Sequence, residues 1–114
     1  MGPSEVATGN WGGDHIAMTV ASSSAHLEFD CAHADVPTTL RVNKRGEFNA
    51  AGTFVREHGG PIRVGELPDA HPAVFAGSAT ATALAVTIRL SDNSDVIGTF
   101  SLAHGATGRV VKCL

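Results

Sequence analysis

Apolar and polar residues alternate along most of this chain with a period of two residues. The clearest run places Leu84, Val86, Ile88 and Leu90 on one face of a strand. Such alternation is typical of strands that bury one face, whereas the 3.6-residue period of an amphipathic helix is nearly absent. The chain is therefore predicted to be all-β.

Turn residues divide the chain into eight expected strands. They cover residues 11–20, 24–32, 37–42, 47–56, 73–79, 82–91, 95–103 and 107–113. Short connections favour antiparallel pairing of sequence neighbours, and an even strand count lets the last strand pair with the first. We therefore predict an eight-stranded antiparallel up-and-down (meander) β-barrel with little or no helix. A sandwich is the alternative, but it needs longer crossovers.

The length of 114 residues is that of one domain. We expect an N-terminal arm over residues 1–9, whose Met1-Gly2 start can replace a removed signal peptide, and a barrel over 10–114. Residues 57–72 form a long loop rich in glycine and proline. Loops of that length are often functional.

Composition and charge exclude two classes of partner. The net charge is −3 and the lysines and arginines are dispersed, so no nucleic-acid partner is expected. No apolar run approaches the roughly 20 residues of a membrane-spanning helix. No cofactor is expected either.

The sequence Gly9-Asn10-Trp11 resembles the G-x-W motif that precedes the first strand of lipocalins and avidins, which are calycin-type barrels. The resemblance implies that Trp11 closes one end of the barrel. It also implies that a basic side chain of the last strand packs on the indole ring by a cation–π contact. Arg109 and Lys112 are the candidates, and arginine stacks better on aromatic faces.

A longer pattern is similar to a group of small bacterial secreted proteins. It comprises residues 11–16, residues 29–33 and the terminal Lys112-Cys113-Leu114. This similarity implies a secreted or periplasmic protein in its mature form, without a signal peptide. It brings no activity with it.

Cys31 and Cys113 are the two cysteines, and the sequence leaves their pairing open. A bridge would close a loop of about 80 residues and contribute roughly 4 kcal/mol. One strand lies between them, and two strand spacings, about 10 Å, exceed the span of a disulfide. A bridge therefore requires the C-terminus to cross the barrel end, where Gly12 and Gly13 leave room. Two buried free thiols are the alternative.

The six histidines show no spacing typical of a metal site, so none is predicted. A hairpin turning at residues 22–23 would pair Met18 with Leu27 and Ile16 with Phe29. The same register places His15 opposite Asp30 on the outer face, as a histidine–carboxylate pair.

We find no residue pattern of an enzyme: no serine stands in a nucleophile elbow, and no glycine-rich loop precedes a helix. The alternation of Ile16 and Met18 points Asp14 inward, beside Cys31. There it would accept hydrogen bonds near Trp11 or a basic residue, such as Arg109. No catalytic residue is predicted.

The inward face offers a candidate ligand cavity. An eight-stranded barrel is either filled by side chains or holds one small ligand. Four hypotheses follow: a binding module for a small apolar ligand under the 57–72 loop, a protein-interaction barrel such as a secreted inhibitor using 57–72 or 1–10, a structural barrel with a filled core, and an enzyme that uses Asp14 or a histidine. The expected cavity residues are Ile16, Met18, Leu27, Phe29, Phe48, Phe54, Val86, Ile88, Phe100 and Leu102.

Overall fold

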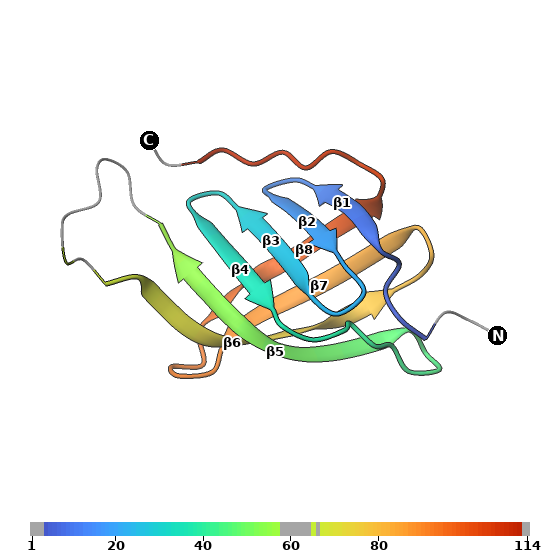
Figure 1. Ribbon diagram of the computed structural model, residues 1–114, viewed down its shortest axis with the longest axis horizontal. Coiled ribbons are helices and arrows are strands. Elements are labelled where there is room, and N and C mark those ends of the chain that lie inside the picture. Colours follow the sequence, from blue (N-terminus) through green and yellow to red (C-terminus); the bar gives the residue numbers. More distant parts are fainter. Residues whose placement is uncertain (1–3, 58–64, 66, 113–114) are drawn as a thin grey trace.

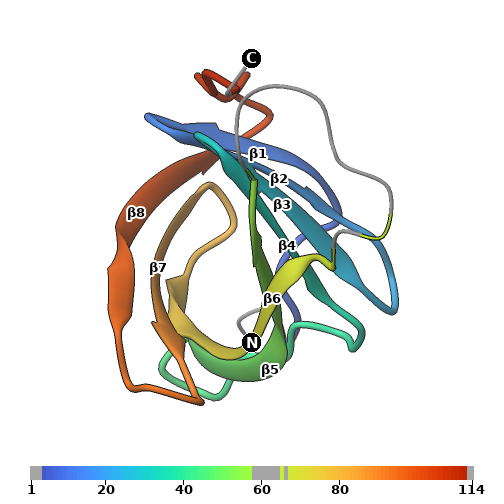
Figure 2. The ribbon, with the colours of Figure 1, turned by 90° about the vertical axis from the view of Figure 1, so that its left-hand side faces the viewer.

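The computed structural model describes residues 4–57, 65 and 67–112. These residues form a closed barrel of eight antiparallel strands in meander order, with no helix among them (Figures 1 and 2). The predicted fold class is confirmed. The strands are β1 (Gly9–Gly13), β2 (Ile16–Val20), β3 (Ala25–Phe29), β4 (Ala32–Val36), β5 (Glu47–Arg56), β6 (Asp69–Ala79), β7 (Ala83–Leu90) and β8 (Val96–His104).

Two of the expected strands are in fact hairpins. The expected strand 11–20 contains β1 and β2, and the expected strand 24–32 runs through the turn between β3 and β4. Each turn has two residues, and the second adopts a positive φ, 67° at His15 and 55° at Cys31. Cys31 therefore lies in a turn rather than on the inner face of a strand.

Two other expected strands are absent from the described structure. Residues 37–42 belong to the connection between β4 and β5, where the amide of Val6 donates to the carbonyl of Leu40 at 2.9 Å. Residues 107–112 form no regular strand and make one isolated bridge, between Asp14 and Arg109. The count of eight is right because the two unexpected hairpins compensate for these two losses.

The barrel closes between β1 and β8 over a short length. Only Trp11 with His104 and Gly12 with Ala103 are paired there. The chain after β8 then returns along the outside of β1 and β2 as a C-terminal segment, residues 106–112 (Figure 1). A Cβ atom on Gly12 would come within 2.5 Å of the carbonyl oxygen of Ala106 and the amide nitrogen of Gly108. Glycine is therefore what allows this close approach.

The register of the β2–β3 hairpin is as predicted, with Ile16 opposite Phe29 and Met18 opposite Leu27. Nine of the ten inward residues that the sequence predicts are buried, and Phe100 is half-buried. Burying these side chains is the main favourable contribution to folding, at roughly 25 cal/mol per Å². Leu84 and Leu90, which the alternation places on the same face as Val86 and Ile88, are buried as well, and core residues that the sequence analysis did not single out include Val36, Ala34, Ala73 and Phe75.

The two barrel ends differ in their connections. One end carries the turns at 14–15, 30–31 and 91–95, and we call it the mouth. The opposite end carries the connections at 21–24, 37–46 and 80–82. Trp11 pairs with His104, the last residue of β8, whose amide bonds to the carbonyl of Thr82 at this opposite end.

Replacing Gly12 by alanine is expected to displace the C-terminal segment and to destabilise the barrel by about 3 kcal/mol, the upper part of the range that overpacking typically costs. Gly105→Ala is the control, because its φ of 81° is strained for alanine but a Cβ there meets nothing within 4 Å. We expect about 1 kcal/mol for this control. Urea unfolding measures both, and equal losses would contradict the steric explanation.

Candidate functional site

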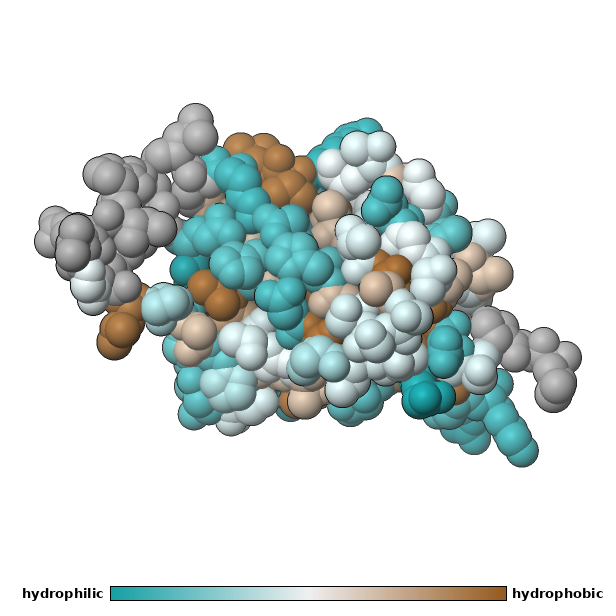
Figure 3. Space-filling model, in the orientation of Figure 1, coloured by the Kyte–Doolittle hydropathy of each residue, from teal (hydrophilic) through white to brown (hydrophobic). Residues whose placement is uncertain are grey.

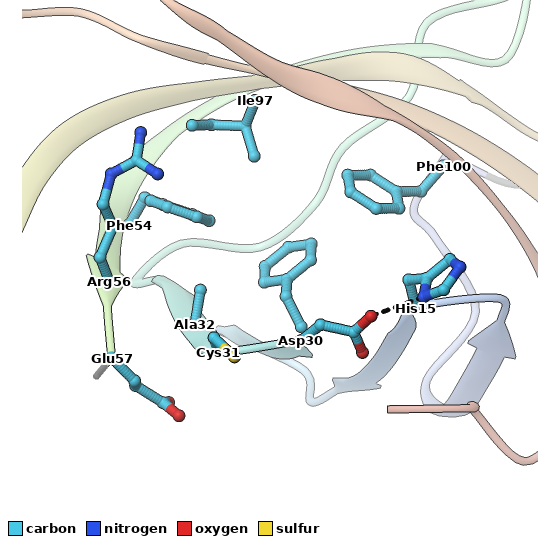
Figure 4. A pocket seen from close by; sticks show the side chains of 10 residues that line it. His15, Asp30, Cys31, Ala32, Phe54, Arg56, Glu57, Ile97 and Phe100 are labelled. Carbon is cyan, nitrogen blue, oxygen red and sulfur yellow. Dashed lines mark hydrogen bonds and ion pairs between the residues drawn. The ribbon is translucent and has the colours of Figure 1, made fainter. Parts of the chain in front are cut away.

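A pocket of about 390 Å³ lies at the barrel mouth (Figure 4). We call it the mouth pocket. Its volume falls within the roughly 300–1,000 Å³ range of small-molecule sites. Four of the ten lining residues are polar or charged, namely His15, Asp30, Arg56 and Glu57, and the others are apolar or cysteine. The lining residues are His15, Phe29, Asp30, Cys31, Ala32, Phe54, Arg56, Glu57, Ile97 and Phe100.

Three phenylalanines form the apolar part of the lining. The ring centroid of Phe29 lies 5.6 Å from that of Phe54 and 5.2 Å from that of Phe100. Both pairs are tilted, at 57° and 55°, which is a favourable arrangement for aromatic rings. Each ring comes from an inward position on a different strand, so the strands on opposite sides of the barrel hold the group together.

A β-bulge brings Ile97 into the lining. Ile88 pairs with Gly98, but Arg89 pairs with Val96, so Ile97 is an extra residue on β8. A bulge reorients the side chains beside it. Ile97 is half-buried and faces the pocket, whereas Val96 is 54% exposed and does not line it.

Arg56 continues the inward row of β5. Phe48, Ala50, Gly52 and Phe54 occupy this row, and Arg56 is its last member at the mouth. Its guanidinium carbon lies 5.7 Å from the centre of the Phe54 ring. A charged residue at the end of an inward apolar row is a sequence signal for the barrel mouth, and the sequence analysis missed it.

The opposite rim is formed by the pair that the sequence predicts. His15 Nδ1 lies 2.6 Å from a carboxylate oxygen of Asp30. The other oxygen of Asp30 accepts a hydrogen bond of 2.8 Å from the amide of Val111. The hydrogen bond from Val111, followed by that from His15, lowers the pKa of Asp30 below its ordinary value.

Two other hollows lack aromatic lining. One, of about 370 Å³, lies beside Leu84 and Ser101, and the other, of about 540 Å³, lies beside Thr38 and Asn49. Hydroxyl, alanine and proline residues dominate both. Volume alone would favour the second, and each of the three is lined by one arginine, but of these three only the mouth pocket is lined by phenylalanine rings.

Only part of the predicted cavity lines the mouth pocket. Phe29, Phe54 and Phe100 do, and the remaining seven predicted residues pack in the core at exposures of at most 6%. The apolar space therefore lies at the end of the barrel rather than along its axis. Residues 58–64 and 66 of the expected lid lie outside the described residues.

The surroundings of Trp11 differ from those predicted. The indole is 1% exposed, and its Nε1 donates to the carbonyl of Ala7 at 2.9 Å. The ring that packs on it belongs to His104, with centroids 4.9 Å apart. Sequence reasoning placed Arg109 there because it took residues 107–113 as the closing strand, whereas β8 closes the barrel.

Asp14 is also placed differently. It lies in the β1–β2 turn and is exposed, as is Arg109, and their side chains form a salt bridge of 3.6 Å. The inward direction was predicted by carrying the alternation of β2 through this turn. Asp14 is therefore a surface residue at the mouth, and its partner is Arg109, whereas the partners of Trp11 are Ala7 and His104.

Hydrophilic side chains gather over β3 and β4 (Figure 3). Lys112 is central to them, because its ammonium lies 2.7 Å from Glu28, 3.0 Å from Glu57 and 2.8 Å from the carbonyl of Ala32. His26 bonds Asp35 at 2.6 Å and also contacts Glu28, while His33 bonds Glu57 at 2.7 Å. We call these six side chains the histidine–carboxylate cluster: His26, Glu28, His33, Asp35, Glu57 and Lys112.

The cluster shifts several pKa values. Partial burial alone would raise the pKa of Glu28, but hydrogen bonds from Lys112 and His26 outweigh it and lower the pKa. Glu57 behaves likewise, with His33 and then Lys112 opposing the effect of burial. The hydrogen bond with Asp35 raises the pKa of His26 above 6.5 despite some desolvation. The cluster attaches the C-terminal segment to β3, β4 and the residue after β5.

A second histidine lies between two carboxylates. His71 contacts Asp92 at 2.6 Å and Asp69 at 2.7 Å. The hydrogen bond with Asp92, then that with Asp69, raises its pKa. Within the described ranges, no three histidine, cysteine or acidic side chains are arranged to hold a metal ion. The described part of the chain also has no helix long and apolar enough to cross a membrane.

The C-terminal segment crosses the barrel end next to Cys31. Val111 bonds to Asp30 and Lys112 bonds to Ala32, the two residues that flank this cysteine. Cys31 is not a free thiol. Cys113 lies outside the described residues, so its pairing with Cys31 stays a prediction.

Comparisons of the chain with protein-family models, with curated proteins and with solved structures found no match. The barrel architecture is consistent with a calycin-type fold, and the function must be argued from the site itself.

Asp35→Asn is expected to lower the pKa of His26 toward 6.5, because it removes the largest cause of the upward shift. The raised pKa means that the pair stabilises the fold below about pH 6.5 and loses this effect as pH rises through the folded-state pKa. NMR titration of the imidazole signals measures the shift. Asp95→Asn, which removes a carboxylate remote from His26, should leave it unchanged.

If Cys31 and Cys113 form a disulfide, the unfolded and unreduced protein should not react with iodoacetamide, and the reduced protein should carry two carbamidomethyl adducts. Mass spectrometry measures the number of adducts in both cases. Reduction should also lower the free energy of unfolding by about 4 kcal/mol, since the bridge closes a long loop. Two alkylated thiols without reductant would show that the bridge is absent.

Proposed function

We propose that this barrel is a small binding module that holds a largely apolar ligand in the mouth pocket. The observation that carries the proposal is the group of Phe29, Phe54 and Phe100 around a space of about 390 Å³. Apolar pockets with a few polar groups at one side are the common form of small-molecule sites. Phe100 is half-buried, so a ligand would cover apolar surface that water now reaches.

The barrel scaffold favours this function over catalysis. The acidic groups of the lining are already engaged: Asp30 bonds to His15, and Glu57 bonds to His33 and Lys112. Among the described lining residues, Cys31 is the residue of a nucleophilic type, and it is not a free thiol. These contacts favour a ligand-binding function for the mouth pocket over a catalytic one.

The compartment that we propose is secreted or periplasmic. The approach of the C-terminal segment to Cys31 supports a disulfide, and disulfides persist in oxidising compartments. The inhibitor alternative relies on residues 57–72 and 1–10, several of which lie outside the described residues. It stays a prediction, as does the structural barrel with no ligand.

Ile97→Trp is expected to fill part of the mouth pocket and to weaken binding of a neutral apolar probe, such as Nile red or octanol, by about tenfold. Val96→Trp is the matched control, because the neighbouring side chain is exposed and outside the lining. Fluorescence titration and calorimetry measure binding, and thermal unfolding checks that both variants fold. Absence of probe binding by the unaltered protein would favour the structural barrel instead.

A further inference from the structure

Arg56 is a charged residue on a strand face that is otherwise apolar. It stands on the inward row of β5, where the four preceding members are apolar or glycine. Charged residues on an inward barrel row are costly unless they reach water or a partner. Arg56 reaches the mouth and lies over Phe54, with 5.7 Å between the guanidinium carbon and the ring centre.

The other charged groups of the lining already have partners. Asp30 accepts hydrogen bonds from His15 and from the amide of Val111. Glu57 binds His33 and Lys112, and Figure 4 shows its carboxylate turned away from Phe54 and Phe100. Among the described residues, the Arg56 side chain makes no ion pair or hydrogen bond, and Asp69, which lies opposite Arg56 on β6, is bonded to His71. The Arg56 guanidinium is therefore the charged group of the described lining that has no charged partner.

An arginine beside apolar rings is suited to bind the carboxylate group of a ligand. Its guanidinium offers a planar fork of N–H donors that fits a carboxylate in a bidentate manner. The Phe54 ring supports the guanidinium by a cation–π contact and limits its freedom. A cationic ligand would meet repulsion at Arg56, and the rim carboxylates that could attract it are already bound.

We propose that the ligand of the mouth pocket is an organic carboxylate, with an apolar chain or ring against the phenylalanines and its carboxylate on Arg56. This inference rests on the proposed function and adds the charge of the ligand to it. The modest pocket volume favours a medium-length chain over a long lipid. Arg56 is then the residue that determines specificity for the charged group.

Octanoate and octanol test the proposal, because they share a chain and differ in the charged group. The unaltered protein is expected to bind octanoate about tenfold more tightly than octanol. Arg56→Gln should weaken octanoate binding by about five- to tenfold and leave octanol binding unchanged. Raised salt should weaken octanoate binding alone. Calorimetry and NMR titration, including the Arg56 Nε–H signal, provide the measurements.

Arg89→Gln is the matched control, since Arg89 is also exposed, has no ion-pair partner in the described structure and lies outside the lining. It changes the net charge equally and should leave octanoate binding unchanged. Arg56→Lys should retain part of the preference, because the charge remains while the fork is lost.

The outcomes separate the two proposals. Equal binding of octanoate and octanol by the unaltered protein would overturn the carboxylate proposal and leave the apolar site standing. Equal weakening of both probes by Arg56→Gln would also overturn it, because Arg56 would then act only by packing on Phe54. Binding of neither probe would overturn the binding function itself.

Discussion

Closure of the sheet between β1 and β8 is the constraint on which the other features of this barrel depend. Two residue pairs join these strands, so the closure needs support from elsewhere. The C-terminal segment provides it by packing over Gly12 on the outside of the seam. Its amide at Arg109 bonds to the carbonyl of Gly13, and its carbonyl there accepts from the amide of His15. A closed sheet has no exposed edges along the paired length, which protects it from pairing with other chains.

Closure also explains where the apolar space lies. An eight-stranded barrel is just wide enough for its interior to be filled by side chains, and here the middle is filled by residues such as Ile16, Leu27 and Ile88. The mouth pocket lies where the rows of inward-facing side chains end. At the mouth, β5 ends with Arg56 and β8 is irregular at Ile97, so the inner rows no longer complete the core. The mouth pocket is thus a consequence of strand ends and a bulge rather than of a hollow barrel.

The alternation of the sequence predicted the fold class, the bounds of β5 and the register of β2 with β3, because these depend on burial of one strand face. It did not predict the turns at 14–15 and 30–31. In a hairpin with a two-residue turn, the sequence numbers of two paired residues differ by an odd number. Inward-facing residues are therefore odd-numbered before the turn, as Phe29 is, and even-numbered after it, as Ala32 is. The sequence analysis continued the odd-numbered pattern to Cys31 and so did not detect the turn. The bulge that exposes Ile97 to the pocket leaves no signal in the hydrophobic pattern, because it depends on how β7 and β8 pair.

The mouth pocket is structurally coupled to the C-terminal segment, because the same residues line the pocket and bind the segment. Asp30 lines the pocket and accepts a hydrogen bond from Val111, while Glu57 lines it and binds Lys112. The carboxylates that could compete for a ligand are therefore engaged in holding the chain end. Their pKa values are lowered, so they remain ionised and bound to the segment over the neutral range. This use of the acidic groups leaves the Arg56 side chain as the charged group of the lining without a charged partner among the described residues, and the proposed preference for a carboxylate ligand rests on that difference.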